Sequence, residues 1–519
     1  MPSQALVALA AALSAASVVQ AVQPSTDAAA QRGPYIFNTV FDSLRKYGST
    51  IHPNGMSLYL ATVPQGVLFH HGNGHNSTPT TLDWLAYEIE HAEMFARSRM
   101  GHPGGPPPIL GSEHIGQAAI GDSDNDNDEF PPPPPPPAAG EDDGHGWLHI
   151  YRTTRPLQFL YIDGMSGDKG SDGVIDTQDY LLRAGNSDSA KKVAATTTTQ
   201  SAKPTQDPPG PPGEFIRAEE LCDLCAEWQL QGVIRTEGAG TEIIKCDFFD
   251  GLEEVQSLRR SDSASKRPGG GGPGGHGPPG RGGPGGRGPG GRRPGGPGGP
   301  PRGFPGPFNA ENGFRDVGGH RTVLDYQSMV SAFFFSINLT NPDGKRSTFP
   351  RLVNAAPSEL VAIKAYLKDV VAARRDAPLA PYSWRDVADL VVRRYAPRLV
   401  SLANATKEDD IKDGLQSVLN VFLDYSVDGK QLREAEARKR CATFYLQTQT
   451  PLQTEADKLL YAGFEAVTTK ICGTLLDALS TFEDGGDAAV TSATTSIKEL
   501  IKYLDWSVFE RSDDGTLYI

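Results

Sequence analysis

The first half of the chain mixes two hydrophobic periodicities. Met56 to Phe69 is rich in Leu, Tyr, Val and Phe and is interrupted by Pro64-Gln65-Gly66, so it predicts two short strands joined by a turn. After Thr80, apolar residues recur at helical spacing, which predicts a helix that ends near Arg97. Further strands, a helix and a hairpin are predicted at 147–151, 157–162, 218–230, 232–235 and 242–248.

The second half follows a helical period. Val387, Leu390, Val391 and Leu399 form one apolar stripe, and a longer stripe runs from Leu460 to Leu479. The sequence therefore predicts an α+β fold, in which a mixed α+β domain is followed by a mostly helical domain.

Composition locates the boundaries between these parts. The chain holds 58 Gly and 42 Pro among 519 residues, and they are concentrated in a few stretches that cannot bury enough apolar surface to fold. We predict low-complexity inserts at about 101–146 and 186–213 and a Gly/Pro/Arg-rich linker at 258–312. The mixed domain then covers 34–257 and the helical domain 313–519.

The N-terminus predicts entry into the secretory pathway. An apolar run rich in Ala and Ser ends at Val19-Gln20-Ala21, which has the form of a signal-peptide cleavage site, so residues 1–21 are assigned to a signal peptide. No later segment is long and apolar enough to span a membrane. We expect a secreted protein, extracellular or in a cell wall, with glycosylation sequons at Asn76, Asn338 and Asn404.

Five cysteines in an oxidising compartment predict two disulfides and one free thiol. Cys441 and Cys472 lie on helices expected to be neighbours, so they should pair. Cys246 should pair with either Cys222 or Cys225, and the sequence leaves that choice open.

The net charge of −14 argues against a chain that as a whole seeks nucleic acid or anionic membrane. The Arg-Gly-Gly repeats of the linker would suggest RNA in an intracellular protein. Behind a signal peptide, a plain disordered spacer is the simpler interpretation, and an acidic polysaccharide is the partner expected if the linker binds anything.

Two further patterns resemble ion sites. His70, His71, His75 and His91 lie close together, but their spacing matches no familiar zinc site, so no metal is predicted. The segment 168–179 follows the calcium-loop template in part, with Gly170 where a side-chain oxygen is needed. The alternatives there are a calcium loop and a polar turn.

One pattern spans the first domain. Phe69-His70-His71-Gly72 closes a strand, Trp84-Leu85-Ala86 leads into a helix, and Thr241-Glu242-Ile243 lies on a late strand. This order resembles the ADP-ribosyltransferase-like fold. The resemblance implies that His71 and Gly72 hold the ribose of NAD, that Trp84 stacks on nicotinamide, and that Glu242 stabilises the oxocarbenium-like transition state. NAD would then be a substrate.

A second hypothesis requires no catalytic or cofactor-binding site. The segments Trp84-Leu-Ala-Tyr-Glu88, Tyr161-Ile-Asp-Gly-Met165 and Asp176-Thr-Gln-Asp179 resemble uncharacterised secreted proteins of filamentous ascomycete fungi. On this view the chain is a non-catalytic extracellular scaffold without a cofactor. The two hypotheses differ in whether His71, Trp84 and Glu242 face one pocket.

Overall fold

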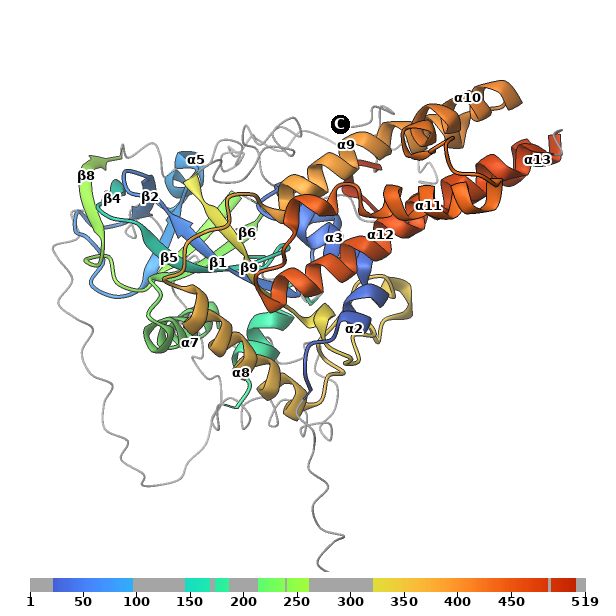
Figure 1. Ribbon diagram of the computed structural model, residues 1–519. Coiled ribbons are helices and arrows are strands. Elements are labelled where there is room, and N and C mark those ends of the chain that lie inside the picture. Colours follow the sequence, from blue (N-terminus) through green and yellow to red (C-terminus); the bar gives the residue numbers. More distant parts are fainter. Residues whose placement is uncertain are drawn as a thin grey trace, which may run out of the picture.

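A computed structural model describes residues 22–96, 145–168, 173–185, 213–238, 240–260, 321–483 and 487–509. These residues form a mixed sheet with helices, followed by a mostly helical region, which confirms the predicted α+β class (Figure 1). The predicted signal peptide lies outside the described residues, as do most of the low-complexity inserts and of the linker.

The strands are β1 (Ser57–Val63), β2 (Leu68–Asn73), β3 (Asp83–Ala86), β4 (Trp147–Thr153), β5 (Leu157–Ile162), β6 (Gly232–Glu237), β7 (Gly240–Lys245), β8 (Leu252–Arg259) and β9 (Val323–Ser331). The helices are α2 (Thr26–Gln31), α3 (Gly33–Asp42), α4 (Lys46–Ile51), α5 (Ile89–Glu93), the π-helix η2 (Thr177–Leu182), α7 (Glu214–Trp228), α8 (Pro357–Arg374), α9 (Trp384–Asn404), α10 (Glu408–Leu419), α11 (Lys430–Thr443), α12 (Glu455–Ser480) and α13 (Asp487–Leu504).

All nine described strands belong to one sheet, in the order β8-β4-β2-β3-β7-β6-β5-β1-β9. β1 and β2 follow one another through the turn at Gly66, which has a φ of +88°. β1 pairs with β5, whereas β2 pairs with β4. Strands β1 and β2 are consecutive in the chain but occupy distant positions in the sheet. The sheet is therefore curled.

The register defines two faces, because directly opposed residues point to the same side. We call one the α7 face; it carries Arg235, Glu242, Ile244, Trp84 and Ala86, and α7 and α5 pack on it. The other face, which we call the α3 face, carries Tyr161. The segment that follows α3 contacts this face, because the Leu44 N–H donates to the Tyr161 hydroxyl at 3.0 Å. The apolar side chains on the α3 face are almost all fully buried and form the core of the curl.

One predicted element is wrong. The segment after Thr80 was expected to be a single helix, but Asp83–Ala86 forms strand β3 and the helix is reduced to Ile89–Glu93. A short apolar run such as Trp84-Leu-Ala is compatible with either state, and pairing with β7 decides it, with Trp84 opposite Ile244 and Ala86 opposite Glu242. The strands predicted at 147–151 and 157–162 are present.

The helical region is organised around α12. Its apolar stripe from Leu460 to Leu475 is buried, as predicted. Asp457 starts the helix by accepting the Thr454 N–H at 3.0 Å, and its second oxygen accepts the Trp384 indole N–H of α9 at 2.9 Å. The same carboxylate therefore caps α12 and connects it to α9 by a hydrogen bond.

Elements from both sides of the linker interlock. α2 and α3 precede it but pack against α12, and β9 follows it but pairs with β1 (Figure 1). At the contact of α3 with α12, a Cβ at Gly33 would lie 2.7 Å from the Gly463 carbonyl, so this close approach depends on glycine. Arg32 donates to the carbonyls of Ala332, Phe335 and Ile337 after β9.

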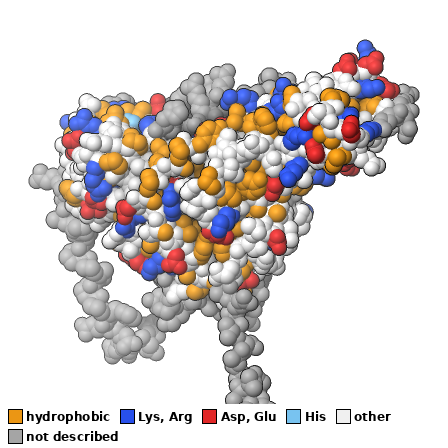
Figure 2. Space-filling model, viewed as in Figure 1, with side chains coloured by type: hydrophobic (Ala, Val, Ile, Leu, Met, Phe, Trp, Pro, Cys, Tyr) orange, Lys and Arg blue, Asp and Glu red, His pale blue; other side chains and the backbone are white. Residues whose placement is uncertain are grey.

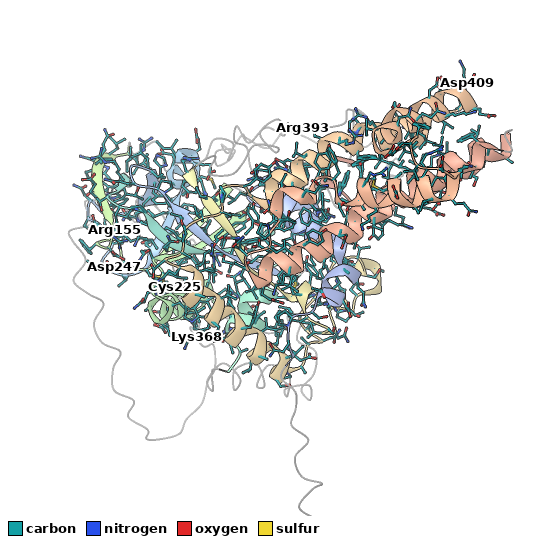
Figure 3. The ribbon with its side chains drawn as sticks, in the orientation of Figure 1. Arg155, Cys225, Asp247, Lys368, Arg393 and Asp409 are labelled. Carbon is teal, nitrogen blue, oxygen red and sulfur yellow. A yellow bond between two sulfur atoms is a disulfide. The ribbon has the colours of Figure 1, made fainter. Side chains whose placement is uncertain are left out.

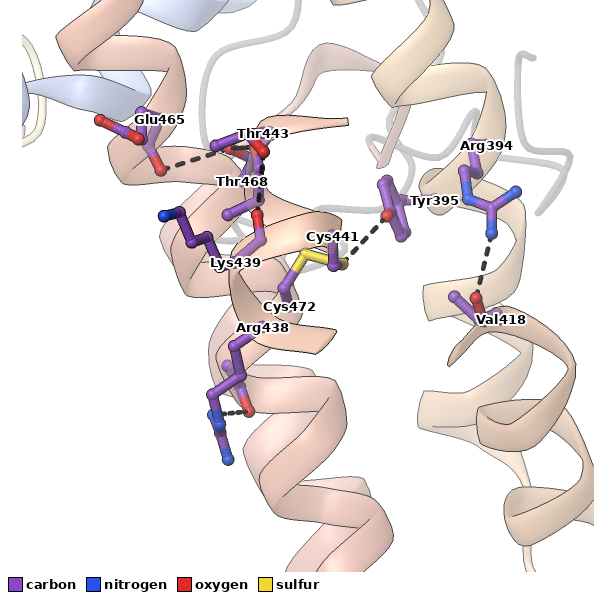
Figure 4. The surroundings of a disulfide bond; sticks show 12 residues. Arg394, Tyr395, Val418, Arg438, Lys439, Cys441, Thr443, Glu465, Thr468 and Cys472 are labelled. Atoms are coloured by element: carbon purple, nitrogen blue, oxygen red, sulfur yellow. Dashed lines mark hydrogen bonds between the residues drawn. A yellow bond between two sulfur atoms is a disulfide. The ribbon is translucent and has the colours of Figure 1, made fainter. Parts of the chain in front are cut away.

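Two disulfides join neighbouring elements. Cys441 of α11 is bonded to Cys472 of α12 (Figure 4), and Cys222 of α7 is bonded to Cys246 beyond β7. Cys225 remains a buried thiol within α7 (Figure 3), and burial raises its pKa to about 12. Among the described helices, none has the length and apolar character needed to cross a membrane.

Replacing Cys441 and Cys472 together by Ala should lower the free energy of unfolding by roughly 3–4 kcal/mol, because the bridge closes a loop of 31 residues in the unfolded chain. Denaturant unfolding of the oxidised protein measures this loss. Cys225→Ala, which removes a buried sulfur but no bridge, is the control and should cost much less. Equal unfolding midpoints for the double variant and the wild type would contradict the stabilising role of the bridge.

Candidate functional site

The most buried charge of the α7 face is Arg235, which is 0 % exposed. Its guanidinium donates to Gln178 Oε1 at 2.8 Å, to Glu242 Oε2 at 2.7 Å and to Glu214. Burial alone would lower the pKa of Arg235, but the Glu242 and Glu214 carboxylates raise it above its ordinary value. Arg235 is therefore a permanent cation held between two elements, with Glu214 on α7 and Glu242 on β7.

Two more arginines extend this cluster, which we call the arginine network (Arg183, Arg217 and Arg235). Arg217 binds Asp179 with two nitrogens, at 2.9 and 3.2 Å, and Glu214 at 2.5 Å. Arg183 binds Glu220 at 2.9 Å. The π-helix Thr177–Leu182 supplies Gln178 and Asp179, so its irregular turn presents two consecutive polar side chains to buried guanidinium groups.

A second polar cluster lies on the α3 face. We call it the histidine chain (His71, Asn73, His149 and Glu254). His71 Nδ1 lies 2.8 Å from the Trp84 carbonyl and must donate to it, so Nε2 accepts from Asn73 Nδ2 at 3.1 Å. Asn73 Oδ1 in turn lies 3.2 Å from His149 Nε2.

His149 ends this chain and is 0 % exposed. Its Nδ1 lies 2.7 Å from Glu254, and its Nε2 faces the His75 carbonyl at 2.9 Å as well as Asn73. Both ring nitrogens therefore face oxygen atoms, Glu254 on one side and Asn73 with the His75 carbonyl on the other. The chain binds the loop after β2 to β4 and β8.

The three residues taken from the ADP-ribosyltransferase resemblance do not converge. Trp84 and Glu242 lie on the α7 face, where Trp84 is 6.4 Å from the Phe215 ring of α7. His71 lies on the α3 face, with its ring 5.5 Å from Phe248. A strand places consecutive side chains on opposite faces, and the pairing of His70 with Ala86 turns His70, rather than His71, toward Glu242. The shared pocket required for NAD chemistry is absent among these residues.

Gly72 also has a structural role. A Cβ there would lie 2.0 Å from the Ala92 carbonyl of α5, so the residue allows α5 to approach β2 closely. The assignment of Gly72 to ribose binding therefore loses its basis. The position of this glycine is explained by helix packing.

The carboxylates of the possible calcium loop are bound to other partners. Asp176 accepts from Arg351 at 2.7 and 3.1 Å and from the Leu352 N–H at 2.9 Å, and Asp179 is held by Arg217. Gly170 and Asp172 lie outside the described residues. Within the described ranges, no group of three or more His, Cys, Asp or Glu residues is placed to hold a metal ion.

His91 and His70, which lie near His71 in the sequence, have partners outside the histidine chain. His91 on α5 faces Glu237 at 2.6 Å; burial lowers its pKa, but the Glu237 hydrogen bond and charge raise it above the ordinary value. His70 Nδ1 donates to the Tyr87 carbonyl at 3.1 Å.

Sequence reasoning missed the arginine network and His149. One signal was available: Val233-Ile234-Arg235 puts a charge directly after two apolar residues of a strand, and such a charge needs a partner if it is buried. Nothing in the sequence indicated that the partners would be Gln178, Glu214 and Glu242, because they come from three separate elements.

Part of the chain is similar to a described family. Residues 27–266, which include strands β1 to β8 and both polar clusters, match the family model described as the YPL277C N-terminal domain. The Saccharomyces cerevisiae protein named "Uncharacterized protein YPL277C" is 32% identical over 228 residues, covering 43% of this chain and 42% of that protein. The chain thus spans less than half of the length of this relative.

A second relative extends into the helical region. "Uncharacterized protein YOR389W" of Saccharomyces cerevisiae is 26% identical over 479 residues, covering 86% of this chain and 71% of that protein. No solved structure matches the chain. These similarities support an uncharacterised family and give no support to the ADP-ribosyltransferase resemblance.

Replacing Arg235 by Met should destabilise the protein by about 3–5 kcal/mol, because the buried Glu242 carboxylate would lose its arginine partner, whereas Glu214 would keep Arg217. Chemical denaturation checks this value. Adding Glu242→Leu to Arg235→Met should recover part of the loss, since the second substitution removes the uncompensated charge.

The control is Lys368→Met on α8. Lys368, labelled in Figure 3, forms an exposed pair with Glu227, so its removal should leave the unfolding midpoint unchanged. An Arg235→Met variant as stable as Lys368→Met would show that the arginine network is not structural.

Proposed function

We propose that the protein is a secreted extracellular component whose curled sheet is a non-catalytic scaffold. The observation that carries the proposal is that the charged groups of the candidate site are bonded to one another. Arg235 has three protein acceptors, and Glu242 is 4 % exposed with its carboxylate on Arg235. A catalytic carboxylate has to reach its substrate, whereas Glu242 is committed to holding β7, β6 and α7 together.

The disulfides support the extracellular part. Cys222–Cys246 ties α7 to the sheet and Cys441–Cys472 ties α11 to α12, so each part of the fold holds one bridge. Bridges of this kind persist in oxidising compartments and are rare in the cytosol.

The sequons agree with this route. Asn76, Asn338 and Asn404 are all exposed, so a glycan at each could extend into solvent. Asn76 accepts a hydrogen bond from the Ser257 hydroxyl at 2.7 Å, and its neighbour Ser77 is also exposed. At Asn404 the side-chain Nδ2, which would carry the glycan, donates to the Val400 carbonyl at 3.0 Å, so modification there would have to break this exposed hydrogen bond.

The surface does not by itself indicate a polyanion partner. On the face shown in Figure 2, acidic and basic side chains are interspersed around apolar ones. Binding of an acidic polysaccharide is therefore proposed only for the Arg/Gly-rich linker, which lies outside the described residues.

Expression in a eukaryotic secretory host should deliver the protein into the medium with Val22 as its first residue and with glycans that an endoglycosidase removes. Intact-mass measurement and N-terminal sequencing check both points. Gln at Asn76, Asn338 and Asn404 together should abolish the mass loss, while Asn420→Gln, an exposed Asn outside any sequon, should leave it unchanged. Retention inside the cell with residues 1–21 still attached would contradict the proposal.

The non-catalytic part has its own test. The wild type and Glu242→Gln, a variant that keeps shape and removes charge, should both fail to hydrolyse NAD. Turnover by the wild type that is lost in Glu242→Gln would overturn the scaffold proposal, even though Glu242 is buried against Arg235.

A further inference from the structure

A small cavity lies where α3, α4 and the end of β5 meet the segment 348–350. Its volume is about 30 Å³, enough for a water-sized group. The polar side chains Asn38, Asp42 and Asp163 line it, each at most 5 % exposed, together with the aromatic rings of Tyr35 and Phe349. None of these residues belongs to the arginine network or the histidine chain.

Asn38 carries the first argument. Its Nδ2 donates to the carbonyls of Leu504 and Asp505, both at 3.0 Å, which sets the orientation of the amide because a flip would turn oxygen toward two carbonyls. The remaining atom, Oδ1, is buried and has no hydrogen-bond partner among the described residues. A buried acceptor at a cavity wall is suited to a ligand that brings a donor.

The charges around the cavity favour a cation. Asp42 accepts from the Ser507 hydroxyl at 2.6 Å and lies 2.7 Å from His52 Nδ1, and His52 Nε2 lies 3.4 Å from Asp505. Burial lowers the pKa of His52, but the Asp42 and Asp505 hydrogen bonds raise it to about 10. The positively charged His52 ring therefore lies beside two carboxylates, those of Asp42 and Asp505, and Asp163 is a third acidic residue at the cavity.

Asp163 is the acid that a ligand would affect most. It accepts the Ser57 N–H at 2.8 Å and is also faced by the Thr39 hydroxyl and the phenols of Tyr59 and Tyr161. These groups are neutral, and burial raises the pKa of Asp163 to about 7. A cation in the cavity would favour its carboxylate form.

We propose that this cavity binds the ammonium group of a small aliphatic primary amine. Such a group brings three N–H donors for Asn38 Oδ1 and the neighbouring carboxyl groups. The Tyr35 ring, 39 % exposed, lines the cavity and stacks one face on Phe333, so its other face is the one left for the cation or its alkyl chain. A metal ion fits less well, since the described residues hold no metal-ligating group of three. The proposal is independent of the extracellular scaffold role.

Calorimetric titration of the full chain with methylammonium tests it. Binding should be about tenfold stronger at pH 8 than at pH 6, because Asp163 is ionised at the higher pH and largely protonated at the lower, and binding at pH 6 should release a proton. Potassium, tetramethylammonium and glucose should bind at least tenfold more weakly. Nα-acetyl-lysine amide distinguishes a protein lysine from a free amine as the source of the ammonium.

Two variants examine the residues. Asp163→Asn should weaken methylammonium binding at pH 8 about tenfold and remove its pH dependence. Tyr35→Leu should weaken binding a few-fold, and its unfolding midpoint is measured alongside because the ring also stacks on Phe333 and donates to the Thr348 carbonyl. Tyr382→Leu, a tyrosine of similar exposure far along the chain, should leave binding unchanged. Lack of methylammonium binding, equal affinity for glucose or tetramethylammonium, or identical affinity at pH 6 and pH 8 would each overturn the proposal.

Discussion

The pairing of β9 with β1 holds the two halves of the chain in one fold. β1 lies between β5 and β9, so its backbone donors and acceptors are satisfied on both sides only when the chain returns after the linker. That return also places Ala332, Phe335 and Ile337 where Arg32 binds their carbonyls. From there the chain continues into the helices that pack around α12, and α2 and α3 meet the same helix from the other end of the sequence.

The polar interior of the protein contains two kinds of group. In the arginine network and the histidine chain, each charged or ring group is bonded to protein partners, which limits the cost of burying it. These clusters connect elements: η2 and α7 to the sheet in one case, the loop after β2 to β4 and β8 in the other. The cavity beside α3 differs, because Asn38, whose Oδ1 has no hydrogen-bond partner among the described residues, lines a space that a ligand could occupy. An unsatisfied buried atom therefore marks a candidate ligand site only where a cavity lies beside it, since Arg235 Nε in the arginine network also has no hydrogen-bond partner among the described residues.

The extracellular scaffold and the amine cavity place different demands on the fold. A scaffold needs a rigid core, and the curled sheet supplies it with the fully buried aromatic and aliphatic side chains of the α3 face and with a bridge on each side of the linker. The cavity needs only local features: an oriented amide, an excess of carboxylates and an accessible ring. The cavity lies at the junction of α3, α4, the end of β5 and the segment 348–350 beyond the linker, so it exists only when both halves of the chain are assembled.

The sequence by itself determined the local elements and the fold class. The strands at 147–151 and 157–162 follow from short runs rich in β-branched, aromatic and other apolar residues, and the apolar stripe of α12 follows from a period of about four residues. Tertiary structure decided what periodicity leaves ambiguous. Pairing with β7 made a strand of Trp84-Leu-Ala, and Cys222 rather than Cys225 faced Cys246.

The candidate site depended even more on tertiary structure. His71, Trp84 and Glu242 are present in the expected order, but a one-residue difference in register puts His71 on the other face from Glu242. Likewise, the partners of Arg235 and the neighbours of Asn38 come from elements far apart in sequence. Local patterns specify which side chains are buried, whereas the strand order and helix packing specify which buried side chains meet.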